Sequence, residues 1–583
     1  MTRGGSRTSS LYARAAIALV ALITTIAAGC GPTAARAPSG DRGPAQDQRS
    51  PKRIAIAMLG EPPAVWDDIK IAGGTVPGIG QFEMLVTAGL AVADEAGTLH
   101  PELAEAVPTT ENGLWELSPD GRMRVTWKIR DGVRWHDGTP FTSDDLLFTA
   151  TVGNDTDLAV LREPAYDLIA DVSAPDPRTI VVSWSQPYIN ADRMFSSGSS
   201  GFAQPLPRHI LERPFNENKE GFLQIPYWNT EFVSTGPFKI RDWQTGSYVT
   251  LDAFDQYVLG RPKLDQIEVK FIADPSTLVA NVLSGAVDLT FSRAVSIEQG
   301  VQVRDQWHDG KIVPNISGTG WTMMYPQLRV PNPAALVEAD FRRALIQSID
   351  REQLAESLAA GLGPVADSII PPDAAEYPAI KDSIVRWPYD TRRATQMIEA
   401  MGFAKGADGF YRDPAGQQVS IEIRTTTNEA NQKSSFAVAD SFQRVGLRSE
   451  AVVIPVQRLQ DNEYRANYPG LELVNQPDGV DGLDNLLDSS AAPLPERNYR
   501  APNKSRNRGS YVNPDYDAMM DKYLTTVPMG DRMKALGALI HFQTDQQLVM
   551  GLFYSVDAIM MTNRLVGVPP ASGWNAHTWD VTS

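Results

Sequence analysis

The sequence predicts an α/β protein in which strands and helices are mixed along the chain. Residues 267–271 alternate as in a strand, 278–283 carry the apolar stripe of a helix, and 288–291 are again strand-like. A strand, a helix and a strand in this order favour a parallel sheet covered by helices. The second half of the chain repeats this style, whereas residues near 90–200 are richer in strands.

Strands are expected in the first half at 53–59, 125–130 and 179–184, where apolar and β-branched residues gather between turn residues. Asp131-Gly132 is a two-residue turn of the kind that favours a hairpin, because both positions tolerate a positive φ. The pattern therefore predicts a return strand at 133–135.

Capping residues mark the expected helix starts. Thr142 can cap a helix whose first turn holds Asp144 and Asp145, where acidic groups are stabilised by the helix dipole. Three further helices are expected to begin at aspartates: Asp274, Asp340 and Asp390. Other elements are expected as strands at 311–316, 420–423, 449–454 and 551–555, and as helices at 517–523 and 531–547.

The first 29 residues are typical of an export signal. Residues 1–14 contain three arginines and no acid, and 15–28 form an apolar run too short for a bilayer core, which needs ~20 residues. The sole cysteine, Cys30, follows Ala-Ala-Gly, which resembles the bacterial lipobox, although that motif usually has leucine at Ala27. The sequence predicts lipidation at Cys30, for example with palmitate; the alternative is a plain secretory signal with a bystander cysteine. Residues 30–50, rich in Pro, Gly and Ala, are expected to be a flexible tether.

Composition limits the class of protein. The formal net charge of the chain is −17, and removal of the three signal arginines would leave −20. This charge argues against nucleic acid as a partner and against adsorption on anionic lipid, so the expected membrane contact is through the lipid anchor only. The roughly 530 residues after the tether are too many for one core and predict two or three domains.

A motif in the first half carries a family resemblance. The stretch WKIRDGVRWHDGTPFTSDDL, 127–146, resembles the signature of the family-5 extracellular solute-binding proteins of ABC importers, the group of oligopeptide- and dipeptide-binding lipoproteins. Trp135, His136, Asp137 and Gly138 form the centre of this match. Further matches follow in the family's order at 234–238, 260–265, 274–277, 341–345, 513–517 and 574–579.

The resemblance implies a two-lobed periplasmic-binding-protein-like fold of the large, peptide-binder class. Lobe I is expected at 51–295 plus 553–583, with an extra subdomain inserted near 86–205, and lobe II at 296–552. A ligand would dock between the lobes, which then close, and a membrane permease would recognise the closed form. The energy of closing can only come from better contacts in the closed state.

The same resemblance points to two ligand-contacting segments. In 318–325, Trp321 and Tyr325 could stack against a ligand or simply fill the core. In 475–481, Asp478 or Asp481 could receive the amino group of a peptide, because an ammonium–carboxylate bond in a closed cleft is strong. The alternative for these two aspartates is a solvated acidic loop.

Other conspicuous residues have a structural interpretation. Residues 135–138 are expected to form a turn whose polar side chains satisfy the backbone. Arg342, Arg343 and Arg351 are expected in salt bridges or on solvated faces. The six histidines lack the spacing of zinc ligands, so no metal site, cofactor or catalytic residue is predicted.

The predicted function is capture of peptides, or of a nickel chelate, oligosaccharide or opine-like solute, for an ABC permease. The protein is expected to be a monomer that is anchored to the outer face of the cell membrane and is not an enzyme. Two alternatives stay open: a secreted lipid-anchored hydrolase, and a surface sensor or scaffold on the same fold. The sequence contains no G-x-S-x-G motif, and its nearest approach is GSSG at 198–201.

Overall fold

The computed structural model describes residues 50–66, 76–158, 164–198, 203–316, 320–483, 486–500, 507–569 and 572–582. The expected signal peptide 1–29, Cys30 and the tether up to residue 49 lie outside the described residues. Within these ranges, none of the helices has the length and apolar character needed to cross a membrane.

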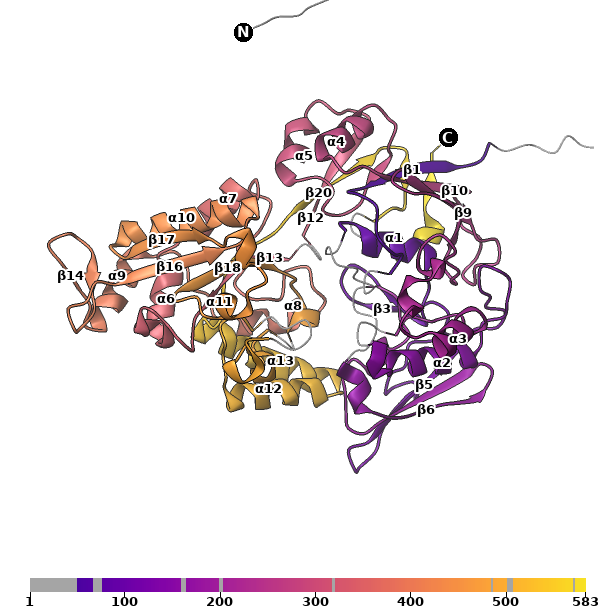
Figure 1. Ribbon diagram of the computed structural model, residues 1–583, viewed down its shortest axis with the longest axis horizontal. Helices are drawn as coiled ribbons and strands as arrows, with labels where there is room; N and C mark the ends of the chain where they lie inside the picture. Colours follow the sequence, from indigo (N-terminus) through magenta and orange to yellow (C-terminus); the bar gives the residue numbers. More distant parts are fainter. Residues whose placement is uncertain are drawn as a thin grey trace, which may run out of the picture. The chain divides into compact units, whose positions relative to one another are not determined.

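Lobe I is built on a seven-stranded sheet with the order β12-β20-β11-β1-β10-β9-β8 (Figure 1). Strand β1 pairs in parallel with both β10 and β11, which confirms the predicted parallel unit. The strands are β1 Arg53–Met58, β8 Phe238–Gln244, β9 Tyr248–Ala253, β10 Gln266–Phe271, β11 Leu289–Thr290, β12 Gly310–Asn315 and β20 Asp557–Thr562. The accompanying helices are α1 Ile79–Val86, α4 Pro275–Leu283 and α5 Ile297–Arg304, and the short pair β21 Leu565–Val566 and β22 Asp580–Val581 lies near the C-terminus.

The inserted subdomain has its own four-stranded antiparallel sheet in the order β4-β5-β7-β6. The expected return strand at 133–135 is wrong: β5 pairs with β4 and β7, and the residues after it form successive tight turns. The elements are β2 Ala91–Ala93, β3 Leu99–Pro101, β4 Trp115–Leu117, β5 Met123–Lys128, β6 Ile169–Asp176, β7 Thr179–Trp184 and α2 Ser143–Gly153; α3 Arg208–Glu217 follows the subdomain. Helix α2 begins as predicted, with the Thr142 N–H donating to Asp145 Oδ2.

Lobe II contains a five-stranded mixed sheet in the order β17-β16-β18-β13-β19. Its strands are β13 Trp321–Pro326, β16 Ser420–Thr425, β17 Arg448–Val453, β18 Leu471–Gln476 and β19 Met550–Tyr554, with the small pair β14 Ala404–Lys405 and β15 Tyr411–Arg412. Its helices are α6 Ala339–Gln347, α7 Arg351–Leu358, α8 Tyr377–Ile380, α9 Thr391–Ala400, α10 Glu429–Val445, α11 Asn462–Ala466, α12 Pro514–Thr525 and α13 Met529–Gln546. Asp390 caps α9 as predicted, but Glu338 stands at the N-cap of α6 and Asp340 lies in its first turn.

Two strand pairs connect the sheets. In lobe I, β12 pairs antiparallel with β20; in lobe II, β13 pairs antiparallel with β19. The chain therefore crosses from one sheet to the other between Asn315 and Trp321 and returns between Tyr554 and Asp557. Because β12 belongs to the first sheet, we propose the outgoing boundary at 316–320 instead of near 295, and the return boundary at 555–556.

Strand β13 divides the core of lobe II. Its side chains alternate between the two faces of the sheet, as the twofold period of a strand requires. Met324 joins a buried cluster with Leu471 and Leu473, whereas Met323 and Tyr325 join a different cluster that contains residues of α12 and α13. The crossing strand is thus packed on both faces.

Candidate functional site

The crossing between the lobes brings the two sequence-predicted segments together. Trp321, at the start of β13, pairs in register with Gln476, at the end of β18. Ser555 N–H donates to the Gly320 carbonyl over 2.9 Å, and Asn475 Nδ2 donates to Ser555 Oγ over 2.6 Å. The end of β18, where the loop at 477–481 begins, is therefore tied directly to both crossing segments.

Gly320 makes this close approach possible. Its φ is +88°, in the left-handed region that favours glycine, and a Cβ atom there would lie 2.3 Å from the Gln476 carbonyl oxygen. A side chain at this position would push the end of β18 away from the crossing. Gly320 lies in the predicted ligand segment 318–325, but its role in this close approach was not predicted.

Trp321 and Tyr325 lie inside lobe II. Their side chains are 2% and 0% exposed and belong to the buried cluster that α12 and α13 cover. The Trp321 ring also fills space beside Gly551, where a Cβ would lie 2.7 Å from it. This packing supports the core interpretation, and stacking against a ligand stays a prediction.

The two candidate aspartates follow β18 in the loop near the crossing. Gly479, between them, donates its N–H to the Ile369 carbonyl over 2.9 Å, which fixes the loop against lobe II. Asp481 Oδ1 lies 3.2 Å from the Arg193 guanidinium, which belongs to the inserted subdomain of lobe I. Asp481 is therefore engaged in a contact between lobes, and a ligand contact at Asp478 stays a prediction.

Arg193 is a residue that the sequence analysis missed. It comes from a short 3-10 turn, Ala191–Arg193, in a segment without a motif. Its partner lies 288 positions away in the sequence. A single sequence carries no signal for a pair this distant.

The signature turn is a structural junction. His136 is buried; its Nε2 lies 3.0 Å from the Gly236 carbonyl, and its Nδ1 lies 3.3 Å from the Ser234 N–H. This pairing fits a neutral ring with the proton on Nε2. Burial lowers the pKa of His136 to about 4, so the ring stays neutral at physiological pH. The histidine thus connects the motif at 135–138 with the motif at 234–238, and these contacts suit packing better than proton transfer.

The other residues of the turn satisfy neighbouring groups. Trp135 Nε1 donates to Asp145 Oδ2 over 3.3 Å, and Asp137 Oδ1 accepts the Thr139 N–H over 2.9 Å. Gly138 has a φ of +89° and donates its N–H back to the Trp135 carbonyl, closing the turn.

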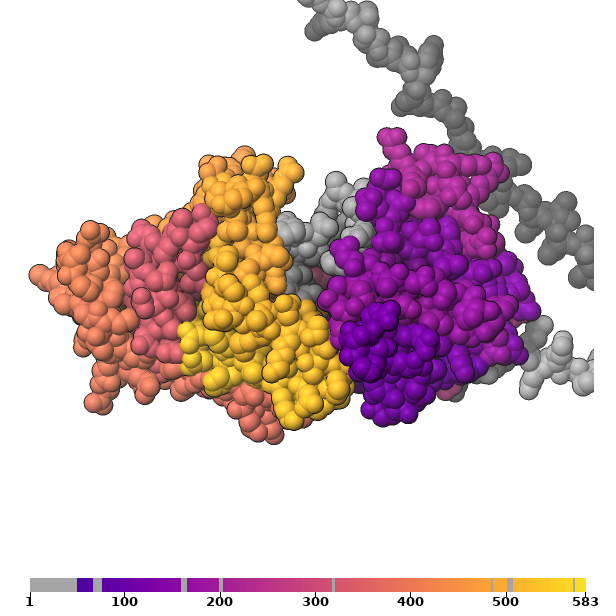
Figure 2. Space-filling model, turned by 90° about the horizontal axis from the view of Figure 1, so that it is seen from below, coloured from indigo at the N-terminus to yellow at the C-terminus, as the bar shows by residue number. Residues whose placement is uncertain are grey.

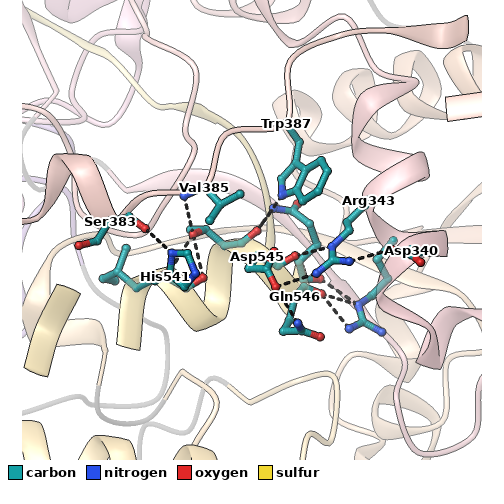
Figure 3. Close-up of polar contacts among 12 residues, drawn as sticks. Asp340, Arg343, Ser383, Val385, Trp387, His541, Asp545 and Gln546 are labelled. Atoms are coloured by element: carbon teal, nitrogen blue, oxygen red, sulfur yellow. Dashed lines mark hydrogen bonds and ion pairs between the residues drawn. The ribbon is translucent and has the colours of Figure 1, made fainter. Parts of the chain in front are cut away.

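Three arginines, Arg342, Arg343 and Arg351, contact the end of α13 and β19, the elements that lead back to the crossing. Arg342 donates to the carbonyls of Leu336, Gln546 and Gln547, over 2.7 to 3.2 Å. Arg343 bridges Asp340 and Asp545 and also donates to the Asp545 carbonyl (Figure 3). Together they cap the C-terminal carbonyls of α13, the helix that precedes β19.

The third arginine acts on β19 itself. Arg351 is 7% exposed; it donates to the Gly551 carbonyl over 3.1 Å and pairs with Asp367 over 2.9 Å. The expectation of a salt bridge or a solvated face is confirmed at Arg343 and Arg351, which both form salt bridges. It is wrong for Arg342, because its side chain is buried and donates to main-chain carbonyls.

Within the described part of the chain, no group of three or more His, Cys, Asp or Glu side chains is arranged to hold a metal ion. The candidate site consists of two lobes, a paired-strand crossing and a polar loop beside it. These features define a two-lobed solute-binding protein.

The family follows from the sequence. The model of the bacterial extracellular solute-binding proteins, family 5, matches residues 98–491, and the chain belongs to this family. The oligopeptide-binding protein AppA of Bacillus subtilis is 24% identical over 420 residues, which cover 69% of this chain and 70% of AppA.

Solved structures share the fold. The structure of Bacillus subtilis AppA in complex with a nonapeptide aligns over 92% of this chain and 100% of its own, with a TM-score of 0.66 and 20% identity. Campylobacter jejuni NikZ in complex with Ni(L-His) aligns over 91% of this chain and 99% of its own, with a TM-score of 0.67 and 21% identity. These likenesses confirm the predicted two-lobed α/β fold.

Proposed function

We propose that this protein is the binding subunit of an ABC importer, which captures peptides between its lobes outside the cytoplasm and delivers them to a permease. The observation that carries the proposal is the paired-strand crossing, with the 475–481 segment, which begins at the end of β18, tied to it by Asn475 and Ser555. A ligand held beside this crossing would contact both lobes and could stabilise their closed arrangement. Membership of an extracellular solute-binding family supports the same role.

Peptide is the favoured ligand class. Asp478 offers a carboxylate for the amino terminus, and a peptide main chain supplies regular hydrogen-bonding groups for the rest of the site. The related AppA was solved with a nonapeptide, whereas NikZ holds a nickel–histidine complex, so the fold itself accepts different solutes.

Mass spectrometry of solutes released from the denatured, purified protein tests this proposal. A ladder of peptides is the expected result, and a single chelate, sugar or opine would redirect the ligand class. We infer that the protein is not an enzyme and acts as a monomer. Incubation with the recovered peptides should leave them intact, and their hydrolysis would favour the lipid-anchored hydrolase instead.

We also propose that Cys30 carries the lipid that holds the protein at the outer face of the membrane. The proposal rests on the sequence around this single cysteine. In a bacterial host, wild-type protein should partition into the detergent phase, and the Cys30→Ala variant should remain in the aqueous phase. Equal partitioning of both proteins would support the plain secretory signal.

A further inference from the structure

The lobes also contact each other through residues 188–193 of the inserted subdomain, here called the seam segment. The Ile189 N–H donates to the Leu524 carbonyl of lobe II over 3.0 Å, and Arg532 donates to the Ile189 carbonyl over 3.4 Å. The Ile189 side chain is 2% exposed and packs in the buried cluster of α12 and α13. Figure 2 shows the surface of these helices, in yellow, meeting the purple surface of the subdomain.

A second main-chain bond supports this contact. The turn between β2 and β3 accepts a hydrogen bond at the Ala96 carbonyl from the Ala375 N–H of lobe II, over 3.3 Å. Two separate parts of the subdomain thus bind lobe II through their backbones. Neither contact involves the crossing strands.

Charged groups concentrate at the seam. Arg193, whose side chain is 13% exposed, pairs with Asp481 over 3.2 Å. Two buried side-chain atoms at the seam, Asp192 Oδ1 and Arg532 Nε, have no hydrogen-bond partner among the described residues. The titratable and charged groups facing the seam are Asp192 and Arg193 from the subdomain and Glu376, Asp481, Tyr523 and Arg532 from lobe II.

We propose that the seam segment is a latch that stabilises the closed lobes without touching the ligand, and that acid strengthens it. The proposal rests on the proposed solute-binding function, because closure matters only if the lobes open and close around a solute. The latch would set how much of the protein is closed before ligand arrives, and hence the apparent affinity.

The acid dependence follows from burial. Burial raises the pKa of Asp192 to about 6, opposed by Arg193 and Arg532, and burial also raises the pKa of Glu376. In open lobes both carboxyl groups would be hydrated and would titrate nearer their ordinary values. The closed form therefore holds protons more tightly than the open form, and lowering the pH favours closure. For Asp192 alone, the closed-to-open ratio should be about tenfold greater at pH 5 than at pH 8.

Hydrogen exchange of the ligand-free full chain tests the latch, with protection of the Ile189 amide as the readout. Arg193→Ala should speed exchange at Ile189 by about two- to fivefold, the range for a partly exposed ion pair. Arg208→Ala is the matched control, because Arg208 pairs with Asp144 and Glu212 within its own lobe, and it should leave Ile189 unchanged. Exchange in Arg193→Ala as slow as in wild type would overturn the latch.

Asp481→Asn breaks the same pair from lobe II and guards against a folding defect in the first variant. Once Arg193 is replaced, adding Asp481→Asn should cause little further loss of protection. A further loss equal to that of Asp481→Asn alone would show that the two side chains act independently and would contradict the pairing.

The acid dependence of the latch is tested by comparing wild type with a variant that lacks both buried carboxyl groups. After correction for intrinsic exchange, protection of Ile189 should rise from pH 8 to pH 5 in wild type and stay constant in Asp192→Asn/Glu376→Gln. Persistence of the wild-type pH dependence in this double variant would overturn the role of the two carboxyls. No ligand is needed for these measurements, so their failure is distinguishable from failure of solute binding, which the released-solute experiment tests.

Discussion

His136 shows how a residue with catalytic chemistry can serve packing alone. The ring joins Gly236 and Ser234 and meets the edge of Phe254 at a centroid distance of 5.1 Å. Replacing it with alanine would leave a buried carbonyl and a buried N–H unpaired. We expect His136→Ala to lower the free energy of unfolding by about 3 kcal/mol, measured by urea denaturation at pH 7.5.

His209 provides the matched control for this prediction. It is partly exposed and lies 2.7 Å from Asp137 at the surface of the same motif. His209→Ala should change stability by less than about 1 kcal/mol. A similar loss in both variants would contradict the junction role of His136.

The pKa of His136 also sets a pH window. Because the folded-state pKa is lowered from 6.5 to about 4, the stability associated with the neutral ring is present above pH 6.5 and is lost as the pH falls toward 4. The unfolding free energy of wild type relative to that of His136→Ala should therefore fall by about 2.5 kcal/mol from pH 7.5 to pH 4.5, as measured by denaturation of both proteins at the two pH values.

Glu102 has the opposite pH dependence. Its buried carboxyl accepts hydrogen bonds from Tyr257, Ser197 and the Gly89 N–H, yet burial outweighs them and raises its pKa from 4.5 to about 7. A raised folded-state pKa gives stability that is present below pH 4.5 and lost as the pH rises through 7.

Glu102→Gln, which mimics the protonated acid, should therefore become more stable relative to wild type as the pH rises. We expect the difference in unfolding free energy to shift by about 3 kcal/mol in favour of the variant between pH 4.5 and pH 8.5. Glu105→Gln, at an exposed position with its own surface ion pair, is the control, and its unfolding free energy at pH 7.5 should differ from that of wild type by less than about 1 kcal/mol. A flat difference for Glu102→Gln would contradict the raised pKa.

At the scale of elements, the arginines of α6 act on a helix far along the chain. Arg342 satisfies three buried carbonyls at Leu336, Gln546 and Gln547, so its removal leaves acceptors unpaired in the core. Arg342→Ala should cost about 2 to 4 kcal/mol of unfolding free energy. Arg213→Ala, whose side chain is 83% exposed in a surface pair with Glu217, should cost less than about 0.5 kcal/mol. Equal losses would mean that the helix end does not depend on Arg342.

Helices and strands were predicted correctly from the sequence where neighbouring residues alone determine the structure. Asp274 and Asp390 cap their helices as the sequence indicates, because a cap depends on neighbouring residues alone. The hairpin expected after β5 failed for the converse reason. The Asp131-Gly132 turn does form, with a φ of +76° at Gly132, but β5 pairs with β4, which precedes it, and with the distant β7, whose pairing no local pattern reveals.

The candidate site was also predicted only in part: its segments could be located from the sequence, but the orientation of its side chains could not. The two segments at 318–325 and 475–481 were located by resemblance to a family, and the structure places them side by side at the crossing. Which side chains point outward was not readable, because β13 is packed on both faces and hides Trp321 and Tyr325. The pair Arg193–Asp481 depends on how two lobes meet, which is a property of the whole molecule.

Ligand-driven closure is the prediction that belongs to the whole molecule. A nonapeptide with a free amino terminus is a suitable probe if peptides are released from the purified protein. Binding to the native form alone should raise its stability by RT ln(1 + [L]/Kd), about 2.7 kcal/mol at a hundredfold excess over Kd. The radius of gyration measured by small-angle scattering should fall at the same time, because closure brings the lobes together.

The Asp478→Asn variant tests whether peptide binding depends on the carboxylate of Asp478. If Asp478 receives the ammonium group, the variant should bind the free peptide at least tenfold more weakly, while binding an N-acetylated peptide as wild type does. Asp517→Asn, in the first turn of α12, is the control with the same change of charge in lobe II. Unchanged affinity in Asp478→Asn would remove Asp478 from the site, whereas a contraction of the wild-type protein on peptide addition would still establish closure. Stabilisation without contraction would mean that the lobes are already closed without ligand, as a strong latch at the seam would cause, whereas absence of both would contradict binding of the peptide to the native form.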